Sequence, residues 1–382
     1  MGRMGLIRTR AVAATLAVAT LAFAACSSPK DVPAASSPTG GSGGASSEIA
    51  ATVAKFKAKP TTIGITEPLK ALPTGKKVAW IGVGTANDIA AYKSFQEAAA
   101  VLGMQATSLQ AGSEVQKEVA AIEQARSEQF DAVILSALLT ASIGPQLTAL
   151  HDSGTKVLGY SASLEGTSSS NVDFSFYSLP EARRFGAIVA DWMIEDSGGR
   201  AHVLDVFPPS AAAGVAQSDG FVDELTAKCT GCKVEKLEFA FSEVGGALPS
   251  RIVTRLQANP DINYIYGTFG AVFVGVPQAL RQAGIDRIRG ATVGGTPVNM
   301  QQIQGGQVLA ASLDQGLQYR GYMLADAVSR LLAGQTVKSD VYNGLDMPAQ
   351  LHTKDNLDFD VTKDWSGEPA DFRDQFKKLW GR

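Results

Sequence analysis

The sequence predicts an α/β protein built from two Rossmann-like domains, each with a doubly wound parallel sheet. Short apolar strands alternate with amphipathic helices, a rhythm typical of parallel sheets that are covered by helices on both faces. The rhythm runs through one half of the chain and then repeats in the other half. The length of 382 residues suits two domains of ordinary size. We therefore expect two similar halves that face each other across a cleft.

The first half follows a short helix expected at 48–57. Its predicted elements alternate strictly between strand and helix, and glycines follow the helices at Gly103 and Gly154. In chain order they are strand 78–82, helix 89–102, strand 104–109, helix 115–128, strand 132–135, helix 143–152 and strand 156–160.

The second half repeats this order and closes with a helix that ends before Gly334. Its predicted elements are helix 180–195, strand 202–207, helix 215–227, strand 234–239, helix 248–257, strand 264–266, helix 272–283, strand 291–293 and helix 320–332.

The N-terminus has the pattern of an export signal. Arginines precede an apolar run at 11–25, which is too short for a spanning helix of about 20 residues but fits a signal-peptide core. Two alanines then precede Cys26, a pattern that resembles a bacterial lipobox, with Phe23 where leucine is usual. We expect residues 1–25 to be a lipoprotein signal peptide and Cys26 to carry the lipid. The alternative is an ordinary signal peptide with an incidental cysteine.

Residues 26–74 are expected to form a tether and the short helix. The stretch 27–47 is mostly Ser, Gly, Pro, Ala and Thr, and it lacks the apolar bulk that would order it. Such a tether would hold the folded body near the outer surface of the cell membrane, anchored there as a lipoprotein.

Several stretches of the second half resemble type I periplasmic binding proteins. They are GVPQALRQAG at 275–284, GGTP at 294–297, IQGG at 303–306, LAASLDQ at 309–315, and the helix from Gly321 to the LAG at 332–334. They follow that family's order, and the likeness covers about 76–351. The nearest branch is the sugar-type substrate-binding subunit of ABC transporters, such as ribose-binding proteins.

This resemblance implies two domains joined by three chain crossings, with the ligand held between them. We expect the crossings near 176–179, 313–315 and 345–348. The N-terminal domain would then comprise 75–178 and 314–345, and the C-terminal domain 179–313 and 346–382.

Composition and motifs argue against catalysis, cofactors and nucleic acid. The net charge of −3 offers no basic surface for nucleic acid. The three histidines lie far apart, which excludes a local His-rich metal site and leaves no evident catalytic triad. Gly82 and Gly84 lack the third glycine of a dinucleotide turn, so a tight exit from the strand is the better interpretation. We predict no enzyme activity, no cofactor and no metal.

Cys229 and Cys232 have the spacing of a redox pair or of half a zinc site. They follow a predicted helix end, whereas a reactive pair lies at a helix N-terminus. An exported chain meets an oxidising environment, so a structural disulfide is the favoured interpretation.

The candidate ligand residues follow from the rule that ligands bind beyond the carboxyl ends of strands in open α/β sheets. Gln315 also lies where the ribose-type pattern has a ligand-contacting glutamine. The aromatic candidates have an alternative role as core residues that cap the strands, and Asp88 has an alternative role as a helix N-cap. The candidates are Thr85, Asn87, Asp88, Leu138, Tyr160, Ser161, Phe176, Tyr177, Phe207, Phe269, Thr296 and Gln315.

The predicted function is capture of a small molecule in the interdomain cleft and its delivery to an ABC permease, by a monomer. The alternative is a ligand-sensing surface lipoprotein that signals to a membrane receptor. Charged positions of the sugar-binding pattern fall on Gly270, Gly294 and residues near Val215 and Leu139. We therefore expect a small neutral molecule with an apolar or aromatic face, or a short polyol, ahead of a common aldose.

Overall fold

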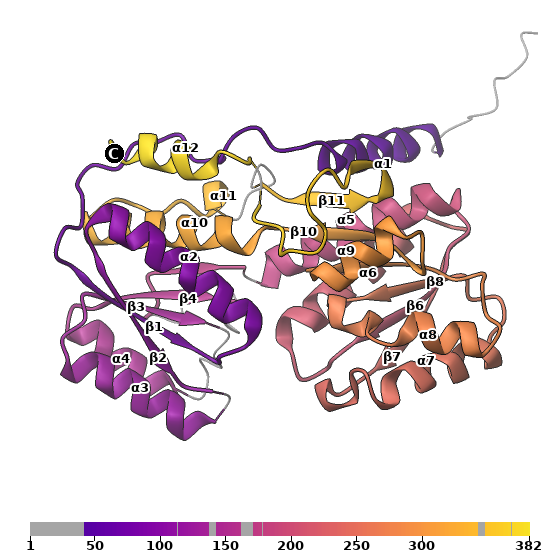
Figure 1. Cartoon of the computed structure of the whole chain (residues 1–382), viewed down its shortest axis with the longest axis horizontal. Helices are drawn as coiled ribbons and strands as arrows, with labels where there is room; N and C mark the ends of the chain where they lie inside the picture. Colours follow the sequence, from indigo (N-terminus) through magenta and orange to yellow (C-terminus); the bar gives the residue numbers. More distant parts are fainter. Residues whose placement is uncertain are drawn as a thin grey trace, which may run out of the picture. The chain divides into compact units, whose positions relative to one another are not determined.

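A computed structural model describes residues 42–382 except 113, 137–142, 162–170, 178, 343–347 and 368. The predicted signal peptide, Cys26 and most of the predicted tether lie outside the described residues, as does the candidate Leu138. The described chain contains two sheets, which define the two lobes of the fold (Figure 1).

The sheet of the first lobe has five strands in the order β2-β1-β3-β4-β5, and all neighbouring pairs are parallel. Four of these strands match the predicted ones. The fifth has only three residues and was not predicted; it ends at Phe176, where the first crossing was expected to begin. The strands are β1 (Lys77–Gly82), β2 (Gln105–Gln110), β3 (Ala132–Ser136), β4 (Lys156–Tyr160) and β5 (Phe174–Phe176).

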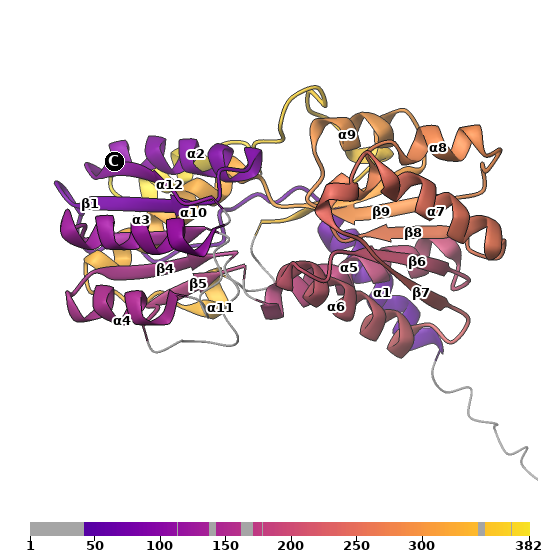
Figure 2. The same ribbon diagram turned by 90° about the horizontal axis from the view of Figure 1, so that it is seen from below.

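Strand β1 shows why this sheet is covered on both faces. Val78 and Trp80 belong to one buried cluster, while Ala79 and Ile81 belong to another, as expected when successive side chains alternate between the faces. Helices α2 (Ala86–Leu102) and α10 (Leu317–Leu332) contribute to the first cluster. Helices α3 (Val115–Ser127) and α4 (Gly144–Asp152) contribute to the second (Figure 2).

The sheet of the second lobe has six strands in the order β11-β10-β9-β8-β6-β7. Only β11 is antiparallel to its neighbour, so the doubly wound parallel fold is confirmed in both lobes. The strands are β6 (His202–Phe207), β7 (Lys233–Glu238), β8 (Tyr264–Gly267), β9 (Arg289–Val293), β10 (Leu309–Asp314) and β11 (Gln350–Thr353).

Helices also cover both faces of the second sheet. Side chains of α1 (Ser42–Lys57), α5 (Leu179–Ser197) and α6 (Ala212–Lys228) form one buried cluster. Those of α7 (Ala247–Ala258), α8 (Val276–Gln282) and α9 (Pro297–Gln304) form the other. The helix predicted at 272–283 is divided, because a short 3-10 helix, η3 (Gly270–Phe273), precedes Gly275 and α8.

The predicted domain boundaries need correction at both ends of the folded body. Helix α1 is not part of a free tether, because Ile49, Val53 and Phe56 are buried in the core of the second lobe. The segment that follows carries Ile63 and Ile65 into the core of the first lobe. The chain therefore passes between the lobes once before the first predicted crossing.

The last helix, α12 (Phe372–Leu379), packs on the first lobe, although 346–382 was assigned to the C-terminal domain. Phe372, Phe376 and Trp380 lie four residues apart on one helix face and are buried against α10. The Nε1 of Trp380 donates to the buried carboxylate of Asp326, at 2.7 Å. The chain thus crosses once more, between β11 and α12.

The first two predicted crossings lie where the chain leaves one core for the other, between β5 and α5 and between β10 and α10. Most of the third lies outside the described residues, between Tyr342 of the first core and Ala349 of the second.

Cys229 and Cys232 form a disulfide, as predicted. Cys229 ends α6 and is buried, and β7 begins directly after Cys232. The bond therefore closes the turn between a helix and a strand.

Glycines bring α5 and α6 into backbone contact. A Cβ atom placed on Gly186 would lie 2.0 Å from the carbonyl oxygen of Gln217, and one on Gly220 would lie 2.0 Å from that of Arg183. This close approach fixes α5 directly after the first crossing and sets the position of Gln217.

We predict that Gly186→Ala lowers the free energy of unfolding by about 1–3 kcal/mol, because the added methyl group must push the two helices apart. Urea denaturation would measure it. The control is Gly144→Ala at the start of α4, where a Cβ meets open space. Equal stability of the Gly186 variant and wild type would contradict the close packing.

Candidate functional site

Three predicted site residues meet in one cavity where the chain crosses between β10 and α10. Asn87 comes from the start of α2 in the first lobe, Thr296 from the start of α9 in the second, and Gln315 from the crossing itself. The cavity has a volume of about 70 Å³. Its lining is completed by Gly294, Gly295, Asp314, Gly316, Leu317, Arg320, Asp364 and Trp365.

Arg320, which the sequence analysis did not select, connects two further predicted residues to this cavity. Its Nε donates to the Oε1 of Gln315 at 2.9 Å, and its Nη1 donates to the hydroxyl of Tyr160 at 3.3 Å. The guanidinium also lies over the ring of Tyr177, 4.9 Å from the ring centre. The side chain of Arg320 therefore contacts the end of β4 and also the first and second crossings.

Only one of the two polar atoms in the side-chain amide of Gln315 has a hydrogen-bond partner among the described residues. The side chain is buried, with 6% of its surface exposed, and its Oε1 is occupied by Arg320. Its Nε2 has no hydrogen-bond partner in the described structure. Because a buried donor without a partner costs about 1–3 kcal/mol, this nitrogen is a position at which a bound molecule would gain a hydrogen bond.

Asp314 holds the loop at the end of β9 against the crossing. Its Oδ1 accepts from the backbone N–H of Gly295 at 2.5 Å and from the Oγ of Ser312 at 3.0 Å. Its Oδ2 lies 2.8 Å from the Nδ1 of His352 on β11, and His352 is fully buried. Strands β10 and β11 and the loop after β9 thereby share one carboxylate next to the cavity.

A buried carboxyl group interacts electrostatically with Arg320. Glu181, in the first turn of α5, is 4% exposed, and its Oε1 lies 3.9 Å from the Nη2 of Arg184. Burial raises its pKa to about 7, although Arg184, Arg320 and the backbone N–H of Tyr177 favour the charged form. Tyr177 is hydrogen-bonded through its hydroxyl, which accepts from the Nε2 of Gln217 at 2.8 Å.

Asp88 and Thr85 serve the fold of the first lobe. Asp88 is buried, and its carboxylate accepts from the Nε1 of Trp80 at 2.8 Å and from the N–H of Gly84 at 3.0 Å. The N-cap of α2 is Thr85, whose hydroxyl accepts from the N–H of Asp88, so the alternative N-cap role of Asp88 is wrong.

The remaining candidates lie away from the cavity lining. Phe176 is fully buried in the first core, with its ring edge-on to Tyr342. Ser161 is half-buried, and its N–H donates to the carbonyl of Phe176. Phe207 is buried at the end of β6, beneath the amino group of Lys236. Phe269 is half-buried at the end of β8, beside Phe241.

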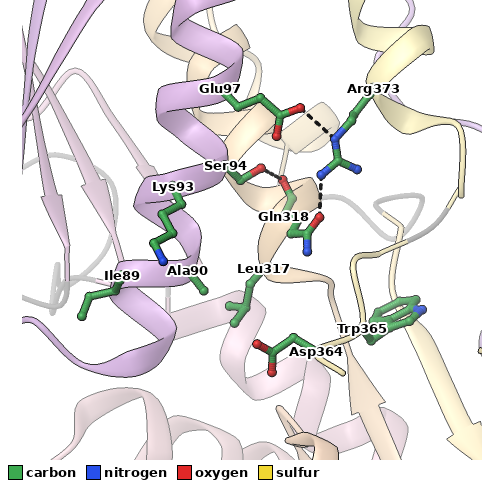
Figure 3. Close-up of a pocket in the computed structure, with 10 residues that line it drawn as sticks. All are labelled: Ile89, Ala90, Lys93, Ser94, Glu97, Leu317, Gln318, Asp364, Trp365 and Arg373. Carbon is green, nitrogen blue, oxygen red and sulfur yellow. Dashed lines mark hydrogen bonds and ion pairs between the residues drawn. The ribbon is translucent and has the colours of Figure 1, made fainter. Parts of the chain in front are cut away.

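A second, larger cavity of about 580 Å³ adjoins the first and shares Leu317, Asp364 and Trp365 with it. Figure 3 shows it between α2, the start of α10 and the C-terminal segment. Its far side is closed by Arg373, whose Nε donates to Glu97 at 3.0 Å and whose Nη2 donates to Gln318 at 2.5 Å.

The described residues hold neither a candidate metal site nor a candidate membrane span. No cluster of three or more His, Cys, Asp or Glu side chains there has the arrangement of a metal site. Every helix in that part of the chain is too short or too polar to cross a membrane.

Comparison with known proteins gives one family match and several relatives. The model of the periplasmic binding protein domain matches residues 78–336. The xylitol-binding protein of Mycolicibacterium smegmatis is 25% identical over 251 residues, which cover 65% of this chain and 68% of that protein.

Solved structures with a similar fold include two from ABC transporters. One is an ABC sugar transporter subunit from Rhodobacter sphaeroides, with 24% identity and a TM-score of 0.63, covering 74% of this chain and 99% of the other. Another is a solute-binding protein from Agrobacterium vitis with bound allitol, with 22% identity and a TM-score of 0.63, covering 74% and 96% of the two chains.

The raised pKa of Glu181 predicts a pH dependence of stability. The folded state keeps this proton up to about pH 7, whereas the unfolded chain releases it near 4.5, the ordinary pKa of a glutamate. The free energy of unfolding should therefore fall by about 1–3 kcal/mol as the pH rises from about 5 to 8. Glu181→Gln, which cannot ionise, should show a smaller fall in urea titrations.

The matched control is Glu123→Gln on α3, where the carboxylate is exposed and pairs with Arg126. Part of the fall should persist in the Glu181 variant, because burial also raises the pKa of Asp205 to about 7. A Glu181→Gln profile that runs parallel to wild type would contradict this assignment.

Proposed function

This chain belongs to the periplasmic binding protein family, and from that premise we propose that it captures a polyol or sugar for an ABC importer. The family match spans more than half of the chain and agrees with the resemblance expected from its sequence. The observation that supports the ligand position is the unpaired, buried Nε2 of Gln315, a residue that lines the cavity between β10 and α10.

The chemistry of that cavity suits a neutral, polyhydroxylated ligand. Each hydroxyl both donates and accepts, and Asn87, Thr296 and Gln315 offer donors and acceptors without net charge. The guanidinium of Arg320 already donates a hydrogen bond to the amide of Gln315, and it interacts electrostatically with the carboxyl group of Glu181. A fully anionic ligand would have to compete with these contacts.

The curated relative supports a polyol ahead of a common aldose. The curated relative is a xylitol-binding protein, and one of the similar structures holds allitol. A linear polyol also matches the expectation from the sequence, in which several charged positions of the sugar pattern are replaced by glycine or by apolar residues.

Ligand capture would join the two lobes. A molecule that reaches Asn87 contacts the first lobe, one that reaches Thr296 contacts the second, and Gln315 lies between them. Such a ligand favours the arrangement of the lobes in which all three contacts are made, which is how a binding protein couples occupancy to conformation. The transporter would then recognise the occupied form.

We further propose that Cys26 carries a lipid and holds the protein at the outer face of the cell membrane. The support is the lipobox-like sequence before Cys26 and the polar stretch after it.

We predict that xylitol and related pentitols raise the melting temperature of the wild-type protein at micromolar concentration, while glucose and galactose do so only at much higher concentration.

Gln315→Ala should weaken xylitol binding by about tenfold or more, because the buried amide contact is lost. Isothermal calorimetry would measure the affinities, with Gln301→Ala, at an exposed position of α9, as the control. Preference for an aldose would refute the polyol assignment, and binding of neither class would refute the proposed function.

Cys26→Ala should move the protein from the membrane fraction to the soluble fraction, because no lipid is attached, and it should leave ligand binding unchanged. Fractionation followed by immunoblotting measures this, with Ser37→Ala in the tether as the control. A Cys26 variant that stays with the membrane at the wild-type level would show that the anchor lies elsewhere.

A further inference from the structure

The C-terminal segment after β11 runs between the two lobes before it reaches α12. We call residues 357–371 the tail. Phe359 and Val361 of the tail pack on the core of the second lobe, and Phe372, directly after the tail, is buried in the first. This segment was expected to belong wholly to the C-terminal domain, and none of the candidate ligand residues came from it.

The tail is held against the crossing that carries Gln315. A Cβ atom placed on Gly316 would lie 2.1 Å from the Cα of Gly367, so the two backbones are in direct contact. The N–H of Tyr319 donates to the carbonyl of Ser366 at 3.1 Å. These contacts fix the two residues that precede Ser366 beside the cavity.

Those two residues, Asp364 and Trp365, line the cavity together with Gln315. The ring of Trp365 is half-buried and edge-on to His352, with 4.5 Å between the ring centres. The carboxylate of Asp364 is exposed and forms no hydrogen bond or ion pair within the described part of the chain. In Figure 3 the two side chains leave the tail in different directions, with Asp364 directed toward Leu317.

We propose that Asp364 and Trp365 are ligand contacts, so that the tail supplies one wall of the binding site and part of its specificity. This inference rests on the proposed function. The indole ring offers an apolar face for the C–H groups of a polyol, and the carboxylate accepts hydrogen bonds from its hydroxyls. The two groups complement Gln315 and Arg320, which approach the same cavity mainly as donors.

The position of Asp364 and Trp365 between two cavities supports this assignment. Both residues also line the larger cavity, on the side of α2 and Arg373. They therefore form the boundary between the cavity of Gln315 and the space through which a ligand would enter from that side. Asp364 is exposed, so altering it changes the boundary without touching a core, whereas Trp365 also packs on the buried ring of His352.

The test uses the full-length protein with xylitol as the probe. Asp364→Asn and Trp365→Ala should each weaken xylitol binding by about tenfold, and Trp365→Phe, which keeps an aromatic face, should weaken it by about threefold or less. The matched control is Asp358→Asn on the same tail, where the carboxylate pairs with Lys59 and lines neither cavity. Its affinity should equal that of wild type.

Tryptophan fluorescence adds a readout that a purely structural role would not change. The chain has 4 tryptophans, and Trp80, Trp192 and Trp380 are at most 5% exposed, so xylitol should change mainly the emission of Trp365. Trp365→Phe should abolish this change while it still binds xylitol. The melting temperature of each variant, measured without ligand, identifies any variant that fails to fold, and the Phe and Asn variants decide the question if Trp365→Ala does.

The outcomes separate the two proposals. If wild type binds xylitol, and Asp364→Asn and Trp365→Phe keep both its affinity and its emission change, the tail is not a ligand contact and this inference is wrong. If wild type binds neither xylitol nor any compound of the polyol and aldose panel, the proposed function is wrong and this inference fails with it.

Discussion

The guanidinium of Arg320 is the contact on which the candidate site depends. It joins the end of β4 through Tyr160, the first crossing through Tyr177 and the second crossing through Gln315. Without it, the Oε1 of Gln315 would be a buried acceptor with no partner, and the amide would be free to turn. The orientation of the unpaired donor Gln315 Nε2 therefore follows from a cation that lies five residues further along the chain.

Close backbone contacts give this polar centre a rigid surrounding. Glycines allow close backbone packing of α5 against α6 next to Tyr177 and Gln217. They also allow the tail to pack against the second crossing at Gly316. Asp314 adds a third constraint, because it holds the end of β9 and pairs with His352 of β11. Each contact fixes a segment that enters or leaves the cavity. A binding protein needs such rigidity in its crossings if ligand contacts in one lobe are to influence the other.

The parallel strands could be predicted because buried strands are short apolar runs, such as 78–82 and 132–135. The rule of strand ends selected Asn87 and Thr296, the resemblance to ribose-type proteins selected Gln315, and the three residues line one cavity. Strand β5 was too short to recognise, and β11 carries the polar residues Gln350 and His352. The burial of His352 depends on Asp314, which is distant in sequence.

Other parts of the site could not be found by that rule. Arg320 lies on a helix, and Asp364 and Trp365 lie on the tail, so none of them follows a strand. The sequence does contain a signal for the fold of this region. The spacing of Phe372, Phe376 and Trp380 is that of an amphipathic helix, and it would have predicted a C-terminal helix packed on a core. Which lobe that helix covers depends on Asp326, which lies far away in the sequence.

The two ends of the described chain belong to different lobes, since α1 packs on the second and α12 on the first. A protein fused before α1 and another fused after α12 would therefore each report on one lobe, with neither lobe interrupted. Any rearrangement of one lobe against the other changes the separation of such fusions. The positions just before α1 and just after α12 thus provide attachment points for a fluorescent biosensor based on energy transfer, without circular permutation of the chain.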